Sequence, residues 1–193
     1  MSAALIVAVL AAGAAFAASS TSFKMVRSSA AVTAGCLNGA TANVTINSLG
    51  PVEVMKVTAN NLPRNREFDL FVTQLPNAPF GVSWYQGDLE SDGNGHAVGR
   101  FIGRFSIETF AVAPGAGPAP VVHRSPIQDA STNPAFAPIH TFHLGLWFNS
   151  AKAADAAGCA NTVTPFNGVH NAGVQALSTR TFGDRQGPLR KIQ

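Results

Sequence analysis

The chain has 193 residues, of which 46% are hydrophobic, 12% are charged and 8% are aromatic. This composition suits one domain with an apolar core, and the low charge excludes a disordered polyelectrolyte and a charge-rich coiled coil. The 13 Lys and Arg are nearly balanced by 10 Asp and Glu, and no dense basic stretch occurs. We therefore expect no nucleic-acid partner, because such binding depends on a strongly basic surface.

The first 17 residues have the pattern of a secretory signal peptide. Residues 5–16 are apolar and uncharged, and Ala15-Phe16-Ala17 fits the small-x-small rule of signal peptidases. This run is shorter than the roughly 20 apolar residues of a membrane-spanning helix. We predict a signal peptide over 1–17, export to the extracellular space or the cell surface, and no stable membrane span after cleavage. Because no Lys or Arg precedes the run, an uncleaved anchor is the alternative.

Cys36 and Cys159 are the two cysteines of the sequence. In an exported chain such a pair is most simply one disulfide, and two free buried thiols are the alternative. The bridge would close a long loop, which the chain-entropy treatment values at about 4–5 kcal/mol. The sequence has no CxxC pair and no Cys/His cluster of zinc spacing, so we expect no structural zinc site.

Apolar and polar residues alternate with a period of two through much of the chain after residue 38, as in half-buried strands. Short strands separated by turn residues are typical of an antiparallel sandwich. The pattern therefore predicts an all-β fold: a single immunoglobulin-like β-sandwich domain of about 7–8 strands over 39–193. The predicted strands are 41–47, 51–58, 67–75, 80–86, 96–105, 108–113, 140–148 and 173–179.

Four segments depart from this alternation. Residues 18–38 are rich in small side chains and are predicted to form a flexible tail. Gly93-Asn94-Gly95 tolerates positive φ and predicts a tight turn. Residues 150–157 form the one predicted helix, with Ser150 as its N-cap. Residues 114–138 hold six of the twelve prolines and are predicted to form a long loop, a kind of segment that is often functional.

Residues 62–72 (LPRNREFDLFV) resemble the corner of fibronectin type III and immunoglobulin-like sandwiches, where a Leu-Pro-polar turn precedes a Tyr that begins a strand. Phe68 stands at the Tyr position, so the hydroxyl hydrogen bond of that corner is absent. The resemblance implies the fold and no activity. Residues 76–88 and the run 177–190 are similar to stretches of uncharacterised secreted proteins of high-GC bacteria, which imply no known function.

Asp88, Glu90, Asp92 and Asn94 place an oxygen-bearing side chain at every second position, as calcium-binding loops do. An EF-hand loop closes with a bidentate Glu, and Gly99 stands there instead. The four residues are candidate metal ligands, and a solvated hairpin tip is the alternative. No cofactor is predicted.

Three of the five histidines are candidate ligand contacts: His123, His143 and His170. His143 shares a predicted strand face with Trp147 and could meet His170 from another strand, where the pair could hold copper or zinc. His123 lies in the proline-rich segment. His140 points to the opposite face and is predicted to be a core-edge histidine bonded to the backbone.

Tyr85 and Trp147 are the aromatic candidates for ligand contact. Trp84 alternates with Phe80 and Val82, which predicts a core position, whereas Tyr85 faces the other way. Large aromatic rings on a sandwich face suit contact with sugar rings or peptide chains.

The sequence contains no serine elbow, no HExxH motif and no glycine-rich loop opening a helix. We therefore predict no catalytic residue. The expected function is that of an exported, non-catalytic β-sandwich protein with a binding or structural role. Its partner would be an unknown extracellular ligand, either a cell-wall polysaccharide or a protein. The alternative is a secreted hydrolase or metal-dependent enzyme with a cleft under residues 114–138.

Overall fold

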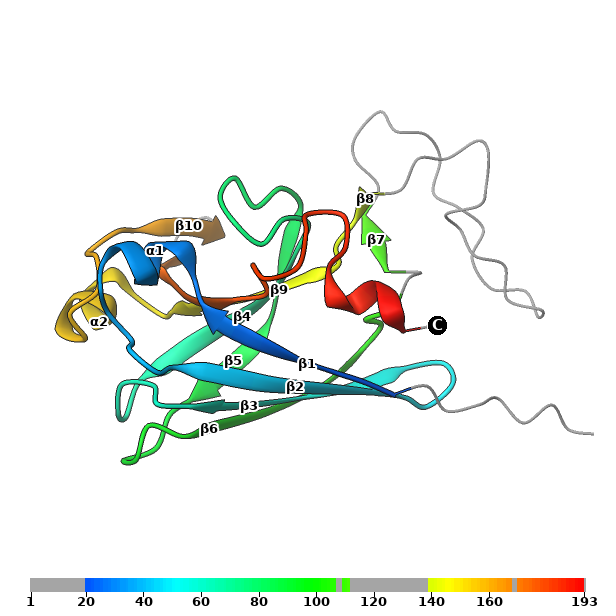
Figure 1. Ribbon diagram of the computed structural model, residues 1–193, viewed down its shortest axis with the longest axis horizontal. Coiled ribbons are helices and arrows are strands. Elements are labelled where there is room, and N and C mark those ends of the chain that lie inside the picture. Colours follow the sequence, from blue (N-terminus) through cyan, green and yellow to red (C-terminus); the bar gives the residue numbers. More distant parts are fainter. Residues whose placement is uncertain (1–19, 107–108, 112–138, 168–169, 193) are drawn as a thin grey trace, which may run out of the picture.

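The structure is a computed structural model that describes residues 20–106, 109–111, 139–167 and 170–192 (Figure 1). The predicted signal peptide and the proline-rich segment 114–138 lie outside these residues. Eight strands form one antiparallel sheet in the order β5-β4-β9-β12-β1-β2-β3-β6. These strands are β1 (Ser20–Arg27), β2 (Thr41–Ser48), β3 (Glu53–Asn60), β4 (Glu67–Thr73), β5 (Ser83–Glu90), β6 (Ala97–Gly103), β9 (His143–Phe148) and β12 (Gln175–Ser178).

Smaller elements flank this sheet. In the described part of the chain, two short pairs of strands stand apart from it, and three helical segments are present. The pairs are β7 (Phe110–Ala111) with β8 (Ile139–His140), and β10 (Thr164–Asn167) with β11 (His170–Ala172). The helical segments are α1 (Ser29–Thr33), α2 (Ala151–Ala156) and the 3-10 helix η2 (Pro188–Lys191).

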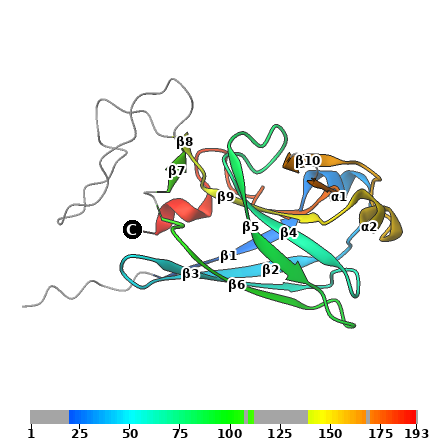
Figure 2. The ribbon, with the colours of Figure 1, turned by 180° about the vertical axis from the view of Figure 1, so that it is seen from behind.

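The large sheet is curled until its two edge strands nearly meet. In Figures 1 and 2, β1, β2, β3 and β6 form one wall, and β4, β5 and β9 form the other. The edge strands β5 and β6 contact each other without exchanging ladder hydrogen bonds. Phe101 of β6 fills the space beside Gly87 of β5, where a Cβ atom would lie 2.6 Å from its ring. Gly87 therefore permits the close approach of the two edges.

The core lies between the two walls, where the inward side chains of every strand meet. Phe68 and Phe148, paired across β4 and β9, have ring centroids 4.9 Å apart. Val44 and Met55 fill the wall made by β2 and β3, and both are fully buried. Each such side chain contributes about 1.5–3 kcal/mol when it leaves water. The period-two pattern seen in the sequence is thus the inner lining of a curled sheet.

The all-β, antiparallel class is confirmed, and the arrangement of the strands differs from the expected one. The eight strands belong to one sheet rather than two, so an immunoglobulin-like sandwich is not confirmed. The prediction of a flexible tail over 18–38 is wrong for residues 20–38, the part of it that the structure describes. Residues 20–27 form β1, which lies inside the sheet between β12 and β2, and residues 29–33 form α1. Phe23 and Met25 supply the inward side chains of β1, while its many Ser and Thr residues conceal the alternation.

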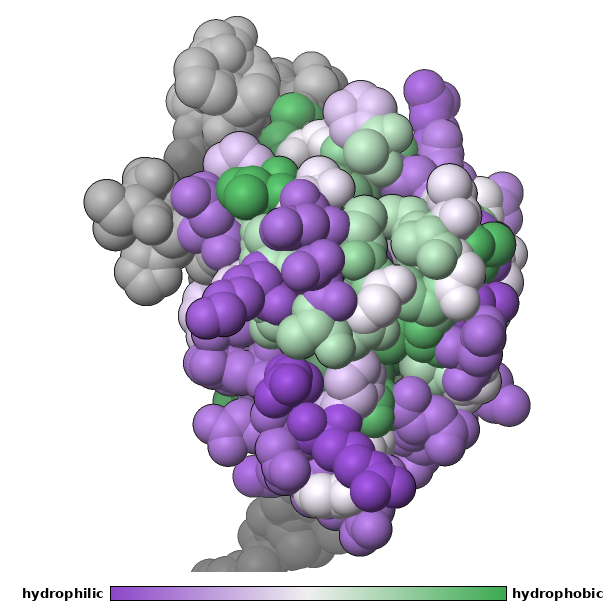
Figure 3. Space-filling view, turned by 90° about the vertical axis from the view of Figure 1, so that its left-hand side faces the viewer, coloured by the Kyte–Doolittle hydropathy of each residue, from purple (hydrophilic) through white to green (hydrophobic). Residues whose placement is uncertain are grey.

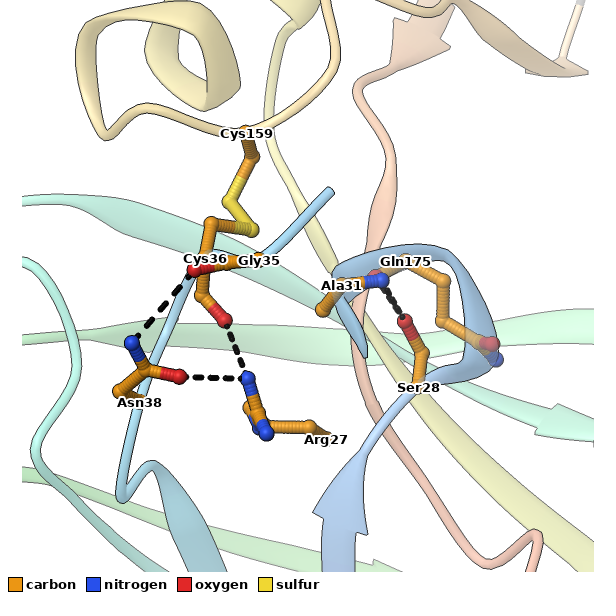
Figure 4. Close-up of a disulfide and its surroundings, with 8 residues drawn as sticks. All are labelled: Arg27, Ser28, Ala31, Gly35, Cys36, Asn38, Cys159 and Gln175. Carbon is orange, nitrogen blue, oxygen red and sulfur yellow. Dashed lines mark hydrogen bonds between the residues drawn. A yellow bond between two sulfur atoms is a disulfide. The ribbon is translucent and has the colours of Figure 1, made fainter. Parts of the chain in front are cut away.

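The predicted helix and disulfide are confirmed. Ser150 caps α2 by accepting a hydrogen bond from the Ala153 amide at 3.2 Å. Cys159 follows α2 and is bonded to Cys36, with Cα atoms 5.3 Å apart across a sequence separation of 123 residues. Figure 4 shows that Arg27 braces this junction, donating hydrogen bonds to the Cys36 carbonyl at 3.0 Å and to an Asn38 side chain at 2.7 Å.

The disulfide joins α1 and α2 at one end of the molecule. Figure 3 views this end, where apolar residues gather toward the middle right and hydrophilic residues toward the lower left. Within the described residues, no helix has both the length and the apolar composition needed to cross a membrane.

Candidate ligand-binding site

The outward face of β4 is buried from Asp69 onward. Phe68, Leu70 and Val72 point into the core, whereas Asp69 and Phe71 point outward and are only 3% and 7% exposed. An outward position on a surface strand is normally solvated. Another part of the chain must therefore cover this side of the sheet.

Two segments supply the cover. The connection between β4 and β5, residues 74–82, folds back on itself through hydrogen bonds from the Gln74 amide to the Val82 carbonyl at 2.8 Å and from the Leu75 amide to the Phe80 carbonyl at 2.9 Å. The second segment is the β10–β11 hairpin. In Figures 1 and 2 the 74–82 connection rises over the sheet beside β10. We call the outward sides of β4, β5 and β9 beneath these segments the covered face.

A cavity of about 700 Å³ lies on the covered face. Its volume falls within the range of about 300–1,000 Å³ that is typical of small-molecule sites. Most of its lining is aromatic or otherwise apolar, with four hydroxyl-bearing side chains among it. The lining residues of this aromatic pocket are Phe71, Thr73, Pro79, Phe80, Gly81, Ser83, Trp84, Tyr85, Trp147, Thr164, Pro165 and Ala172.

The rings of the aromatic pocket form one connected cluster. Trp147 packs edge-to-face against Phe71 at 5.2 Å and against Phe80 at 4.9 Å, measured between ring centroids. Phe71 packs in the same manner against Tyr85 at 5.8 Å. Edge-to-face packing fixes the rings against each other, so the pocket has a rigid wall.

The Trp147 indole can lie flat along its strand because the neighbouring outward position is Gly145. A Cβ atom at Gly145 would lie only 2.2 Å from the indole ring and 2.6 Å from the Gln175 amide nitrogen. Both approaches are shorter than any ordinary contact of a carbon atom. A side chain at this position would therefore displace the indole and reshape the pocket.

Two carboxyl groups lie next to the aromatic pocket. Asp69 and Asp88 stand opposite each other on β4 and β5, and Asp69 is also opposite Trp147 on β9. The pKa of Asp69 is raised to about 7, mainly by burial and to a smaller extent by the negative charges of Asp88 and Glu67 and by a hydrogen bond with the Asp88 carboxyl. One Asp69 oxygen, Oδ2, is buried and has no hydrogen-bond partner among the described residues. This carboxyl group is thus about half-protonated at neutral pH.

Tyr85 links the carboxyl groups to the pocket. Its hydroxyl donates a hydrogen bond of 2.6 Å to Asp88 Oδ1, while its ring lines the cavity. Burial and then this hydrogen bond raise the pKa of Tyr85 above its usual value, so the phenol remains protonated. The Asp88 carboxylate is thereby held at the edge of the aromatic pocket.

The candidate calcium ligands do not form one cluster. Asp88 and Glu90 lie on the outward side of β5, but the Asp92 carboxylate belongs to the turn that follows. Asp92 accepts hydrogen bonds from the His96 amide at 2.9 Å and the Asn94 amide at 2.8 Å, and these bonds lower its pKa. In the described part of the chain, no group of three or more His, Cys, Asp or Glu side chains is placed to hold a metal ion.

The candidate histidines are not gathered at the site. His143 is fully buried, with Nδ1 at 2.9 Å from Thr179 Oγ1 and Nε2 at 3.0 Å from the Asp184 carbonyl, and burial lowers its pKa. It therefore has a structural role in joining β9 to the C-terminal segment. His140 lies in β8 and not in β9 with His143. Its ring stacks on the ring of Phe142, with the ring centroids 4.7 Å apart. His123 and the side chain of His170 lie outside the described residues.

The structure brings two of the five candidate contact residues, Tyr85 and Trp147, into one pocket. It adds three features that the sequence analysis missed: the Phe71 and Phe80 rings, the β10–β11 hairpin and the Asp69–Asp88 pair. One signal for Asp69 was present, since a carboxylate inside the apolar run 67–75 indicates a buried charge. Trp84, predicted to be core, packs against the core and also reaches the cavity.

A scan against protein-family models and searches of curated proteins and of solved structures found no match to this chain. The site therefore has to be interpreted from its own geometry and chemistry.

Proposed function

We propose that this chain is an exported, non-catalytic binding protein that holds its ligand in the aromatic pocket. The observation that carries the proposal is the cavity itself, about 700 Å³ of mostly aromatic and apolar surface on a rigid sheet. Apolar, largely preformed cavities with a few polar groups are the usual form of ligand sites.

The hydroxyl groups of the pocket support binding rather than catalysis. Thr73 Oγ1 donates to the Leu75 carbonyl at 2.9 Å, and Ser83 Oγ donates to the Gly81 carbonyl at 3.3 Å. A serine or threonine nucleophile needs an adjacent base to take its proton, and a backbone carbonyl is not one. These two hydroxyl groups are suited to fixing loops and to contacting a bound molecule.

Export is the second part of the proposal. The signal-like segment 1–17 favours it, and the Cys36–Cys159 bridge is consistent with an oxidising compartment. The resemblance of residues 62–72 to immunoglobulin-like modules is compatible with an extracellular role. The binding proposal does not depend on this resemblance, because Phe71 is the one residue of that stretch among the described residues that line the pocket.

One observation favours an enzyme as the second candidate: the hydrogen-bonded Asp69–Asp88 pair beside the pocket. Two carboxyl groups that share a proton can act as a general acid and a general base. Glycoside hydrolysis does not suit this geometry, because glycosidases keep their carboxyl groups about 5 Å or more apart. The enzyme candidate predicts turnover of some ester or peptide substrate that is lost in Asp88→Asn.

The binding proposal is tested with N-phenyl-1-naphthylamine, a neutral apolar dye whose fluorescence rises in apolar sites. The protein secreted by its own host is titrated with the dye, after its intact mass has established where it begins and whether the disulfide is intact. We expect saturable binding that Phe80→Ala weakens about tenfold, as loss of one ring contact would. Phe182→Ala removes a half-buried ring elsewhere on the molecule and serves as the matched control.

Equal dye affinity in the Phe80→Ala and Phe182→Ala variants would show that the dye does not occupy the pocket, and absence of any saturable binding would overturn the proposal. Turnover in a panel of ester, peptide and glycoside substrates would replace it with the enzyme candidate.

A further inference from the structure

Acidic side chains follow the covered face up to the aromatic pocket in regular rows. Across β4 and β5, Glu67 is opposite Glu90, and Asp69 is opposite Asp88. The next outward pair is Phe71 with Tyr85, whose rings line the cavity. We call Glu67, Asp69, Asp88 and Glu90 the acidic rows. One end of the pocket is therefore bordered by four carboxyl groups.

The acidic rows have neutral partners in the described part of the chain. Glu67 Oε2 accepts a hydrogen bond from the Asn149 amide at 2.7 Å, and Asp88 Oδ1 accepts one from the Tyr85 hydroxyl. The one ion pair found among the described residues joins Glu53 of β3 and Arg104, which follows β6, at 3.1 Å on the other wall. Among the described residues that line the pocket there is no Lys or Arg. The local potential at this end is thus negative, and it attracts a cation.

The rings of the pocket complement a cation as well. An aromatic face carries partial negative charge, and an ammonium group within about 6 Å of a ring centroid is attracted to it. Three of the rings, from Phe71, Tyr85 and Trp147, lie on neighbouring strands next to the carboxyl groups. A ligand whose charge lay near Asp88 would place its apolar part against these rings.

We propose that the aromatic pocket binds a small organic cation, a quaternary or protonated ammonium compound with an apolar body. The Asp88 carboxylate balances its charge, and the rings of Tyr85, Phe71 and Trp147 contact its methyl or methylene groups. The cavity volume fits a small molecule better than a polymer chain. This inference rests on the proposed binding function and names the class of its ligand.

The decisive comparison uses choline and 3,3-dimethyl-1-butanol, which share size and shape but differ in charge. Each is titrated at pH 8 against protein that carries N-phenyl-1-naphthylamine, and displacement of the dye is measured. We expect choline to bind at least about tenfold more tightly than the neutral alcohol, since cation–π and carboxylate contacts exist only for choline. Equal affinities for the two compounds would overturn the inference.

Three single-residue variants test which side chain makes the pocket prefer a charged ligand. Asp88→Asn removes the carboxylate and should reduce choline affinity about tenfold, a larger fall than that in the affinity for the neutral dye measured on the same variant. Tyr85→Phe keeps the ring but releases Asp88, and a smaller reduction, about threefold, is expected. Asp155→Asn, on an exposed turn of α2, is the matched control and should change neither affinity. If choline affinity were the same in Asp88→Asn and the wild type, the assignment of Asp88 would be wrong.

The remaining outcomes separate this inference from the proposed function. If dye binding depended on Phe80 but choline did not displace the dye, the binding proposal would stand and the inference of a cationic ligand would be overturned. Absence of dye binding together with absence of choline binding would overturn both. Phosphatidylcholine vesicles are a third probe, since they present the same headgroup. Displacement by vesicles but not by free choline would assign the site to a membrane surface and exclude a small free ligand.

Discussion

The two walls of the curled sheet have similar inner surfaces and opposite outer surfaces. On β1, β2, β3 and β6 the outward side chains include Lys24, Asn43, Lys56 and Arg100, all exposed to solvent; we call this the open face. The covered face on β4, β5 and β9 carries carboxyl groups and aromatic rings. The open face is an ordinary solvated sheet surface, whereas the covered face behaves as a second, smaller core.

The difference arises from the chain connections rather than from the strands. β2 and β3 are joined by a short turn at residues 49–52, which leaves their outward side free. β4 and β5 are joined by residues 74–82, which fold over the sheet, and α2 leads into the β10–β11 hairpin beside them. Outward positions acquire a binding surface where later parts of the chain return over them.

The largest predicted effect concerns the disulfide that anchors the cover. Replacing both Cys36 and Cys159 by Ser should lower the free energy of unfolding by about 4–5 kcal/mol, because the bridge closes a loop of more than 100 residues. Urea unfolding measures this loss. Hydrogen exchange should show that protection falls more at the β10–β11 hairpin than at β2 and β3. An equal loss at both places would mean that the disulfide does not specifically support the cover.

The second prediction compares one outward residue from each face. Trp147→Ala should destabilise the protein by about 3–5 kcal/mol, since the indole is 3% exposed and packs against two other rings. Ile102→Ala on the open face should change stability by less than about 0.5 kcal/mol, because Ile102 is 61% exposed. Denaturant midpoints of the two variants test the contrast. Similar losses would mean that the covered face is not a second core.

Apart from β1, the main strands of both walls could be predicted from the sequence because alternation is local. The inward residues of β2 and β6, such as Val44 and Phe101, follow the period of two directly. The single-sheet topology could not be predicted in the same way. It depends on β1 pairing with β12, which is about 150 residues away in the sequence, and no local pattern encodes such a partner.

The site was less predictable than the fold for the same reason. Tyr85 and Trp147 were identified because large aromatic side chains are conspicuous in any strand. Asp69 and Asp88 meet only through the register of β4 and β5, which shifts by one residue between Leu70 and Phe71. The sequence of residues 74–82 has no regular pattern of apolar and polar residues from which its fold over the sheet could be predicted. Covering segments are therefore seen only once the strands have been placed.

The third prediction uses the pH dependence of stability. The folded-state pKa of Asp69, about 7, exceeds the ordinary value of 3.8, so between these values the folded state binds more protons than the unfolded state. The contribution of Asp69 to the free energy of unfolding therefore falls by up to about 4 kcal/mol as the pH rises from about 4 to about 7. Asp69→Asn removes this dependence.

Urea unfolding of wild type and Asp69→Asn at pH 5 and pH 8 checks the sign. We expect Asp69→Asn to gain stability relative to wild type on going from pH 5 to pH 8. Asp155→Asn, an exposed carboxylate on α2, should show no such change. If the difference between Asp69→Asn and wild type were the same at both pH values, Asp69 would not be the buried, protonated member of the pair.

The smallest predicted effect belongs to the open face, where Lys56 on β3 stands opposite Arg100 on β6. Two cations directly across an antiparallel pair repel each other, and replacing one by an anion makes the pair attractive. Lys56→Glu should therefore raise the free energy of unfolding by about 0.5 kcal/mol, and added salt should reduce that gain. The substitution should leave the binding of dye and choline at the covered face unchanged, because Lys56 lies on the other wall. A change in choline affinity would show instead that the charge of the open face reaches the pocket, and the two faces could then no longer be treated as independent.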